Sequence, residues 1–87
     1  MKAKVLRSKV HHVESSHLVS IQYSRKYHVL VVAFRDGSIY RFEEVPEYRF
    51  LGLLHPDRAN LTHGRYFASY IRYEFPYQRI DPERRTS

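Results

Sequence analysis

The sequence predicts an α+β domain, in which a three-stranded antiparallel meander is followed by two short helices. Within residues 16–45, polar and apolar side chains alternate in some segments, and another segment is a run of apolar and β-branched residues. Both patterns are typical of strands. The Asp36-Gly37 pair within this region predicts a tight hairpin turn, because both residue types tolerate positive φ angles. After Pro46 the apolar residues recur at helical spacing instead.

The first strand is expected at residues 16–23, where side chains alternate with period two. One face of this strand should carry His17, Val19, Ile21 and Tyr23. The opposite face should carry Leu18, Ser20 and Gln22. A polar turn at 24–26 then leads into residues 27–34, whose continuous apolar character predicts a strand covered on both faces.

The third strand should span residues 38–45, with Tyr40 and Phe42 on one face. The other face should carry Ile39, Arg41 and Glu43. Two alternate aromatic residues on one sheet face usually pack beneath a helix, but such residues also stack on bases in some RNA-binding sheets. Both roles are open for this pair.

The first helix should begin at Pro46, whose ring suits the first helical turn, and should end before Pro56. Its buried stripe would contain Phe50, Leu51 and Leu54. After a loop at 57–62, the second helix is expected at about 64–72, with Thr62 as its N-cap.

The two ends of the chain should differ from the domain at 14–80. Pro76 disfavours helical geometry at the preceding residue, so that residues 75–80 should be extended. Residues 1–13 form a basic N-terminal arm with a His-His pair, which could be frayed or could add an edge strand to the sheet. Residues 81–87 are expected to be a frayed C-terminal tail.

Composition limits the function. The 87 residues suffice for one domain, and the absence of cysteine excludes disulfides and cysteine-based zinc sites. The longest apolar run, 29–34, is too short to cross a membrane, so we expect a cytoplasmic protein without membrane association. The net charge is +6, and eleven of the fifteen basic residues are arginine, which binds phosphate through a planar fork and stacks on bases. This charge favours a polyanionic partner, although it would also serve solubility alone.

The second helix carries the candidate binding surface. On a helical projection Phe67 and Ile71 form a core stripe, whereas Arg65 and Arg72 share a face that points away from it. Three tyrosines flank the core stripe: Tyr66, Tyr70 and Tyr73. Because tyrosine often borders a core with its hydroxyl in water, these side chains could be structural or could stack on a ligand.

Four segments carry a family resemblance, namely SSHLVSIQY at 15–23, LVVAF at 30–34, DGSIYRFEEVP at 36–46 and GRYFASYIRYEFPY at 64–77. In order and spacing they resemble the KTSC domain family, which occurs at the C-terminus of some lysyl-tRNA synthetases and as free-standing bacterial and phage proteins. Phe42 stands where the family has the second tyrosine of a pair. The resemblance implies no settled activity, but the link to a tRNA-charging enzyme implies RNA binding.

We therefore expect a small nucleic-acid-binding module, with RNA as the preferred ligand. Arginines would meet phosphates, and exposed aromatic rings would meet unstacked bases. The expected site comprises Tyr40, Arg65, Tyr66, Tyr70, Arg72, Tyr77 and Arg79. Further phosphate contacts could come from Lys2, Lys4, Arg7 and Lys9 of the N-terminal arm.

A protein-interaction or assembly module is the alternative. Tyrosine and arginine are enriched at interface hot spots, and an edge strand could pair across a two-fold axis to form a homodimer. A phage or bacterial protein of this kind could also bind a host protein complex. An enzyme is not expected, because no cysteine nucleophile, Gly-rich phosphate loop or HExxH motif is present. The six histidines match no metal-ligand spacing, so we expect neither a metal nor a cofactor.

Overall fold

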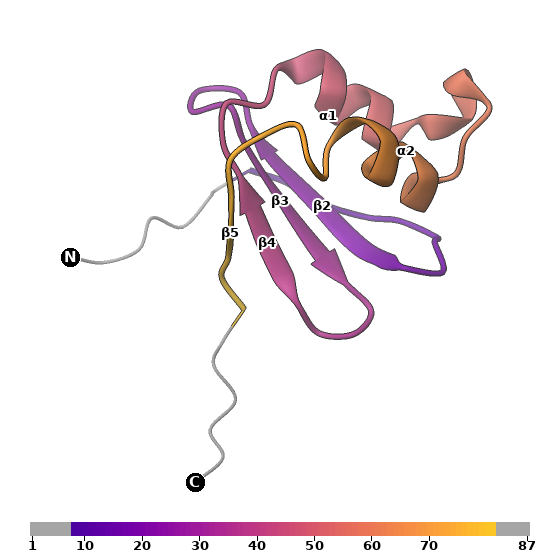
Figure 1. The fold of residues 1–87 in the computed structure, drawn as a ribbon, viewed down its shortest axis with the longest axis horizontal. Coiled ribbons are helices and arrows are strands. Elements are labelled where there is room, and N and C mark those ends of the chain that lie inside the picture. The colour runs from indigo at the N-terminus through magenta and orange to yellow at the C-terminus, as the bar shows by residue number, and fades with distance from the viewer. Residues whose placement is uncertain (1–7, 82–87) are drawn as a thin grey trace, which may run out of the picture.

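The computed structural model describes residues 8–81 and shows a five-stranded antiparallel sheet with two helices packed on one face (Figure 1). The strands follow one another across the sheet in the order β1 (Val10–His12), β2 (Leu18–Ser24), β3 (Val29–Phe34), β4 (Ile39–Phe42) and β5 (Tyr77–Arg79). Between β4 and β5 lie the helices α1 (Glu47–Leu54) and α2 (His63–Tyr70), with a 3-10 helix at Pro56–Ala59 between them. The predicted α+β class, meander and two helices are confirmed.

The two outer strands extend the meander on both sides. In β1, His11 lies opposite Ile21, so that the additional N-terminal strand is present. Beyond Pro76 the chain is extended as predicted and pairs with β4, which places Tyr77 opposite Phe42. Residues 1–7 of the predicted basic arm, with Lys2, Lys4 and Arg7, lie outside the described residues, and so do residues 82–87 of the predicted frayed tail.

A β-bulge in β2 overturns the predicted assignment of its faces. Leu18 lies opposite Phe34, but Ser20 lies opposite Ala33, so that β2 contains one residue more than its partner at this point. The extra residue reverses the alternation on its N-terminal side, and Leu18 is fully buried in the same core as Ile21. The prediction that these two side chains face opposite sides is wrong, because strict alternation assumes an uninterrupted ladder.

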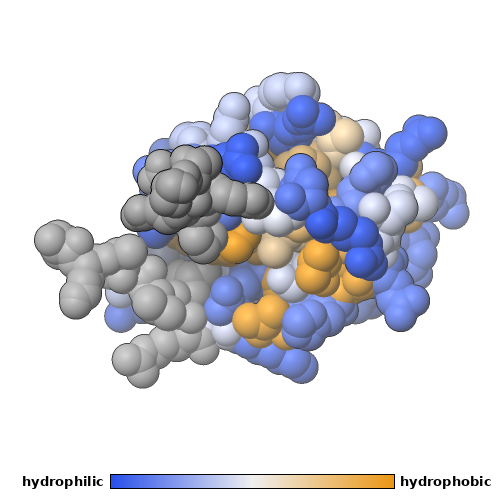
Figure 2. Space-filling model, turned by 90° about the horizontal axis from the view of Figure 1, so that it is seen from below, coloured by the Kyte–Doolittle hydropathy of each residue, from blue (hydrophilic) through white to orange (hydrophobic). Residues whose placement is uncertain are grey.

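The core lies between the helices and the covered face of the sheet. Phe42 and Val32 of the sheet are buried there beneath Phe67 and Ile71. The prediction that Phe67 and Ile71 are core residues is therefore confirmed. From α1 the core receives Phe50 and Leu53, whereas Leu51 of the predicted stripe is 38% exposed, so that the predicted stripe is wrong at this position. On the end of the molecule shown in Figure 2, apolar residues reach the surface only in small patches among hydrophilic ones.

The helix α2 begins and ends close to its predicted bounds. The Oγ1 atom of Thr62 accepts a hydrogen bond of 3.2 Å from the backbone N–H of Arg65, which confirms the predicted N-cap. The helix ends at Tyr70, with Ile71 as the C-cap, so that Arg72 lies just beyond the helix rather than within it. Within residues 8–81, no helix has the length and apolar character needed to cross a membrane.

Candidate nucleic-acid interface

A groove of about 790 Å³ opens between α2 and the part of the sheet formed by β4 and β5. Its third side is formed by the start of β2 and by the hairpin that joins β3 to β4. We refer to this feature as the α2 groove. Its aromatic lining residues are Phe34, Tyr40, Phe42, Phe67, Tyr73 and Tyr77, and its charged ones are Asp36, Arg65 and Arg72.

The aromatic residues of the α2 groove form a continuous series from the core to solvent. Phe42 and Phe67, which are buried, have ring centroids 5.6 Å apart. Tyr40 lies two residues before Phe42 on the same sheet face, and its ring centroid lies 5.7 Å from that of Tyr77. The Tyr77 side chain is 58% exposed. The outer rings can therefore offer a flat face to a ligand while the inner rings hold them in place.

Arg65 and Arg72 form the basic side of the α2 groove. Both are exposed, and neither forms an ion pair with another residue of the described part of the chain. The Arg72 guanidinium lies 5.1 Å from the ring centroid of Tyr73, which is 77% exposed. Because no carboxylate of the described residues lies at ion-pair distance from them, these two side chains are available for an anion.

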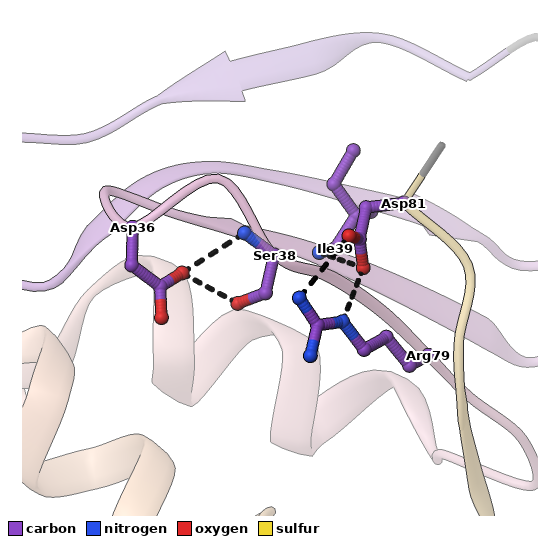
Figure 3. A network of polar contacts seen from close by, with 5 residues as sticks. All are labelled: Asp36, Ser38, Ile39, Arg79 and Asp81. Atoms are coloured by element: carbon purple, nitrogen blue, oxygen red, sulfur yellow. Dashed lines mark hydrogen bonds and ion pairs between the residues drawn. The ribbon is translucent and has the colours of Figure 1, made fainter. Parts of the chain in front are cut away.

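Asp36 places a negative charge in the same groove. Its Oδ1 atom accepts hydrogen bonds from the Ser38 hydroxyl at 2.6 Å and from the Ser38 backbone N–H at 2.9 Å (Figure 3). These two hydrogen bonds lower the pKa of the Asp36 carboxyl. The α2 groove is therefore not uniformly basic, because two arginines and one fixed carboxylate line it.

Tyr66 and Tyr70 lie away from the α2 groove, on the side of α2 that meets α1. Tyr66 is only 5% exposed, and its hydroxyl accepts a hydrogen bond of 3.3 Å from Nη1 of Arg49. The Arg49 guanidinium also lies 4.4 Å from the ring centroid of Tyr70 and 5.0 Å from that of Tyr48. The hydrogen bond to Tyr66 raises the pKa of Arg49. Tyr66 is thus a core residue that fixes Arg49 between two tyrosine rings.

Arg79 lies on β5 and binds a neighbouring carboxylate. Its Nε and Nη2 atoms donate hydrogen bonds of 2.6 and 3.2 Å to the two carboxylate oxygens of Asp81 (Figure 3). Asp81 Oδ1 also accepts a hydrogen bond of 3.2 Å from the backbone N–H of Ile39. The Arg79 side chain lowers the pKa of the Asp81 carboxyl to about 2. This network fastens the end of β5 to the start of β4.

The structure brings together four of the seven residues expected to form the site. Tyr40, Arg65, Arg72 and Tyr77 line the α2 groove, whereas Tyr66, Tyr70 and Arg79 do not. Tyr73 and Asp36 were not included in the expected site. The sequence indicates Tyr73 as one of the tyrosines that flank the core stripe, but it indicates Asp36 only as a turn residue. Its position in the groove depends on where α2 and β5 lie relative to this turn, which local patterns do not reveal.

Gly64 sits where α2 approaches the start of β2. A Cβ atom at this position would lie 3.2 Å from Cδ2 of His17, which also lines the α2 groove.

Among the residues the structure describes, no three His, Asp or Glu side chains are arranged to hold a metal ion. The groove therefore offers aromatic faces, two guanidinium groups and one carboxylate as its binding chemistry.

The structure is that of a small α+β domain with a groove between its last helix and its sheet, lined by aromatic and arginine side chains. The chain belongs to the KTSC domain family, whose sequence profile matches residues 14–75. A crystal structure of a KTSC domain protein from Yersinia pestis is similar, with a TM-score of 0.73 and 26% sequence identity over 83% of this chain and 96% of that chain. No curated protein sequence matches the chain significantly.

Proposed function

We propose that the protein binds single-stranded nucleic acid in the α2 groove, with RNA as its ligand. The observation that carries this proposal is the combination, in one groove, of exposed tyrosine rings with two arginines that have no ion-pair partner within residues 8–81. Aromatic rings stack on unpaired bases of any sequence, and guanidinium groups bind phosphate oxygens.

A single strand fits this arrangement better than a duplex. Stacking on Tyr73 or Tyr77 requires a base whose face is free, and duplex bases are covered by their neighbours. Folded RNAs expose such bases in loops, bulges and ends, and these are the usual targets of sequence-reading RNA-binding proteins. The net charge of +6 adds a general attraction to any polyanion.

The test is a binding titration with labelled single-stranded RNA, tRNA and duplex DNA at several salt concentrations. The Arg65→Glu/Arg72→Glu variant should weaken RNA binding at least tenfold and make the log–log salt dependence shallower by about 1.4, since each phosphate contact contributes about 0.7. The matched control is Lys26→Glu/Arg58→Glu, which changes the net charge equally at exposed positions outside the groove. If both variants weaken RNA binding equally, binding depends on the net positive charge alone and not on the α2 groove.

A protein-interaction module is the second candidate, and one observation favours it. Tyr48 is 64% exposed on α1 and lies beside Arg49, which also contacts Tyr70 on α2. Tyrosine and arginine are the residue types that dominate interface hot spots. We refer to the surface formed by Tyr48, Arg49 and Tyr70 as the outer helical face. If RNA binding fails while Tyr48→Ala abolishes association with a protein partner, the outer helical face is the functional surface.

A further inference from the structure

We propose that Asp36 makes the α2 groove selective for guanine among the unpaired bases of a single strand. This inference rests on the proposed nucleic-acid function and adds the base that the groove prefers. The observation behind it is the negative charge of Asp36 among the lining residues, because a groove that only bound phosphate would not contain a carboxylate.

The position of the Asp36 carboxylate is fixed by its own turn. Both hydrogen bonds from Ser38 are accepted by Oδ1, and Ser38 itself is only 5% exposed. The side chain therefore cannot rotate freely without losing two hydrogen bonds. The same hydrogen bonds lower the pKa of the carboxyl, so that it is ionised at neutral pH.

The second oxygen of Asp36 remains available. Within residues 8–81, Oδ2 accepts no hydrogen bond, and Figure 3 shows the carboxylate on the helical side of the sheet. The guanidinium of Arg79 does not bind Oδ2 of Asp36, because it donates its hydrogen bonds to the two carboxylate oxygens of Asp81. A free, ionised acceptor thus lies in a groove that also contains Tyr40 and Tyr77.

An ionised carboxylate accepts hydrogen bonds and repels phosphate, so a nucleic acid must present donors to it. Guanine has two adjacent donors, N1–H and the N2 amino group, on its Watson–Crick edge. Adenine and cytosine place a ring-nitrogen acceptor next to their amino group, and uracil places carbonyl oxygens on both sides of its single donor. A guanine stacked on the tyrosines could direct both donors to Oδ2 of Asp36, the oxygen that Ser38 leaves free, whereas adenine and cytosine would place their ring-nitrogen acceptor against the carboxylate. The flanking phosphates would meet Arg65 and Arg72.

The test uses fluorescent RNA heptamers of uridine in which only the central base is varied among guanine, adenine, cytosine and hypoxanthine. A single guanine avoids the self-association of guanine runs. The wild-type protein should bind the guanine heptamer about tenfold more tightly than the adenine heptamer, which is close to the lower end of what one hydrogen bond to a charged group contributes. Hypoxanthine, which keeps N1–H but lacks the amino group, should give intermediate affinity.

Asp36→Asn is the decisive variant, because its amide oxygen can still accept both hydrogen bonds from Ser38 while an amino group replaces Oδ2. It should remove the guanine preference and slightly raise the affinity for the adenine heptamer, because the charge that repels phosphate is lost. Asp57→Asn, which removes an exposed carboxylate outside the groove, should keep the preference.

The outcomes separate this inference from the function on which it rests. Equal wild-type affinity for all four heptamers, still weakened by Arg65→Glu/Arg72→Glu, would overturn the guanine selectivity and leave the nucleic-acid function standing. Tightest binding of the cytosine or adenine heptamer would also overturn it, and so would a guanine preference that survives in Asp36→Asn. Absence of binding to every heptamer would overturn both proposals.

Discussion

The hydroxyl group of Tyr66 occupies the space that a side chain at Gly52 would need. A Cβ atom at Gly52 would overlap the Tyr66 hydroxyl and the ring carbon that bears it. Gly52 lies in α1 and Tyr66 in α2, so that this contact sets how closely the two helices approach. The tight approach also brings Arg49 within hydrogen-bonding distance of the same hydroxyl.

Gly52→Ala should therefore destabilise the protein, although alanine is the better helix former. Overpacking costs about 1–3 kcal/mol, whereas replacing glycine by alanine in a helix gains about 1 kcal/mol. In a Tyr66→Leu background, which removes the colliding atoms, the same substitution should instead stabilise the protein by about 1 kcal/mol. Urea denaturation of the four proteins measures this coupling. A stabilising Gly52→Ala substitution in the wild-type background would contradict the close helix contact.

The bulge in β2 predicts that alanine substitutions at two adjacent residues destabilise the protein to very different extents. Leu18 is fully buried, so Leu18→Ala should lower the free energy of unfolding by about 2–5 kcal/mol. Val19 is half-buried, and Val19→Ala should cost distinctly less. Thermal or urea denaturation measures both changes. If Val19→Ala proves the more damaging, β2 has the regular alternation that its sequence alone indicates.

These two features show where sequence patterns are sufficient for predicting this fold and where they are not. The three strands of the meander, the hairpin at Gly37 and the cap at Thr62 depend on local residue types, and the sequence predicts them. The third of these strands, β4, is nevertheless shorter than predicted, because it ends at Phe42 rather than at residue 45. The bulge depends on how two strands pair, and the burial of Tyr66 depends on the position of α1. Both are tertiary constraints, which periodicity within one segment cannot reveal.

The Asp81 carboxylate should make the folded state sensitive to acid. Its pKa in the folded protein, about 2, lies below its ordinary value of 3.8 because Arg79 and the Ile39 N–H stabilise the ionised form. Its contribution to stability is therefore present above about pH 4 and is lost as the pH falls toward 2. Asp81→Asn should be less stable at pH 7 and should lose less stability between pH 4 and pH 2.

Urea denaturation across this pH range, with an NMR titration of the Asp81 carboxyl, checks the acid sensitivity. Asp57→Asn removes a carboxylate elsewhere on the protein and controls for the change in net charge. An Asp81 carboxyl that titrates near 3.8 would mean that Arg79 is not bound to it in solution. Arg79 would then be free for the phosphate contact that the sequence suggested.

Tyr73 and Tyr48 form a matched pair for testing base stacking. Both are exposed tyrosines, 77% and 64% respectively, but only Tyr73 lines the α2 groove. Tyr73→Ala should weaken binding of a uridine heptamer by about 1–3 kcal/mol, the usual contribution of one stacked base. Tyr48→Ala should leave that affinity unchanged, and fluorescence anisotropy measures both. The reverse result would place the RNA on the outer helical face.

The composition of the candidate site was only partly predictable. Helical spacing predicts that Arg65 and Arg72 lie together, and both line the α2 groove, although α2 ends at Tyr70 before it reaches Arg72. Tyr40 and Tyr77 are 37 positions apart in the chain and meet because β5 pairs with β4. On the helical projection Tyr70 and Tyr73 flank the core stripe alike, but in the structure Tyr70 ends α2 and faces α1, whereas Tyr73 lies beyond the helix and lines the groove. Which tyrosines reach the site is decided by packing between elements.

The central claim is that nucleic acid occupies the α2 groove, and amide chemical-shift mapping tests it most directly. Unlabelled uridine heptamer would be titrated into ¹⁵N-labelled protein at near-physiological salt. We expect the largest shifts at Tyr40, Gly64, Arg65, Tyr73 and Tyr77, and small shifts at Tyr48 and Arg49. Shifts that concentrate on the outer face of α1, or that spread over all exposed basic residues and vanish with salt, would contradict the claim.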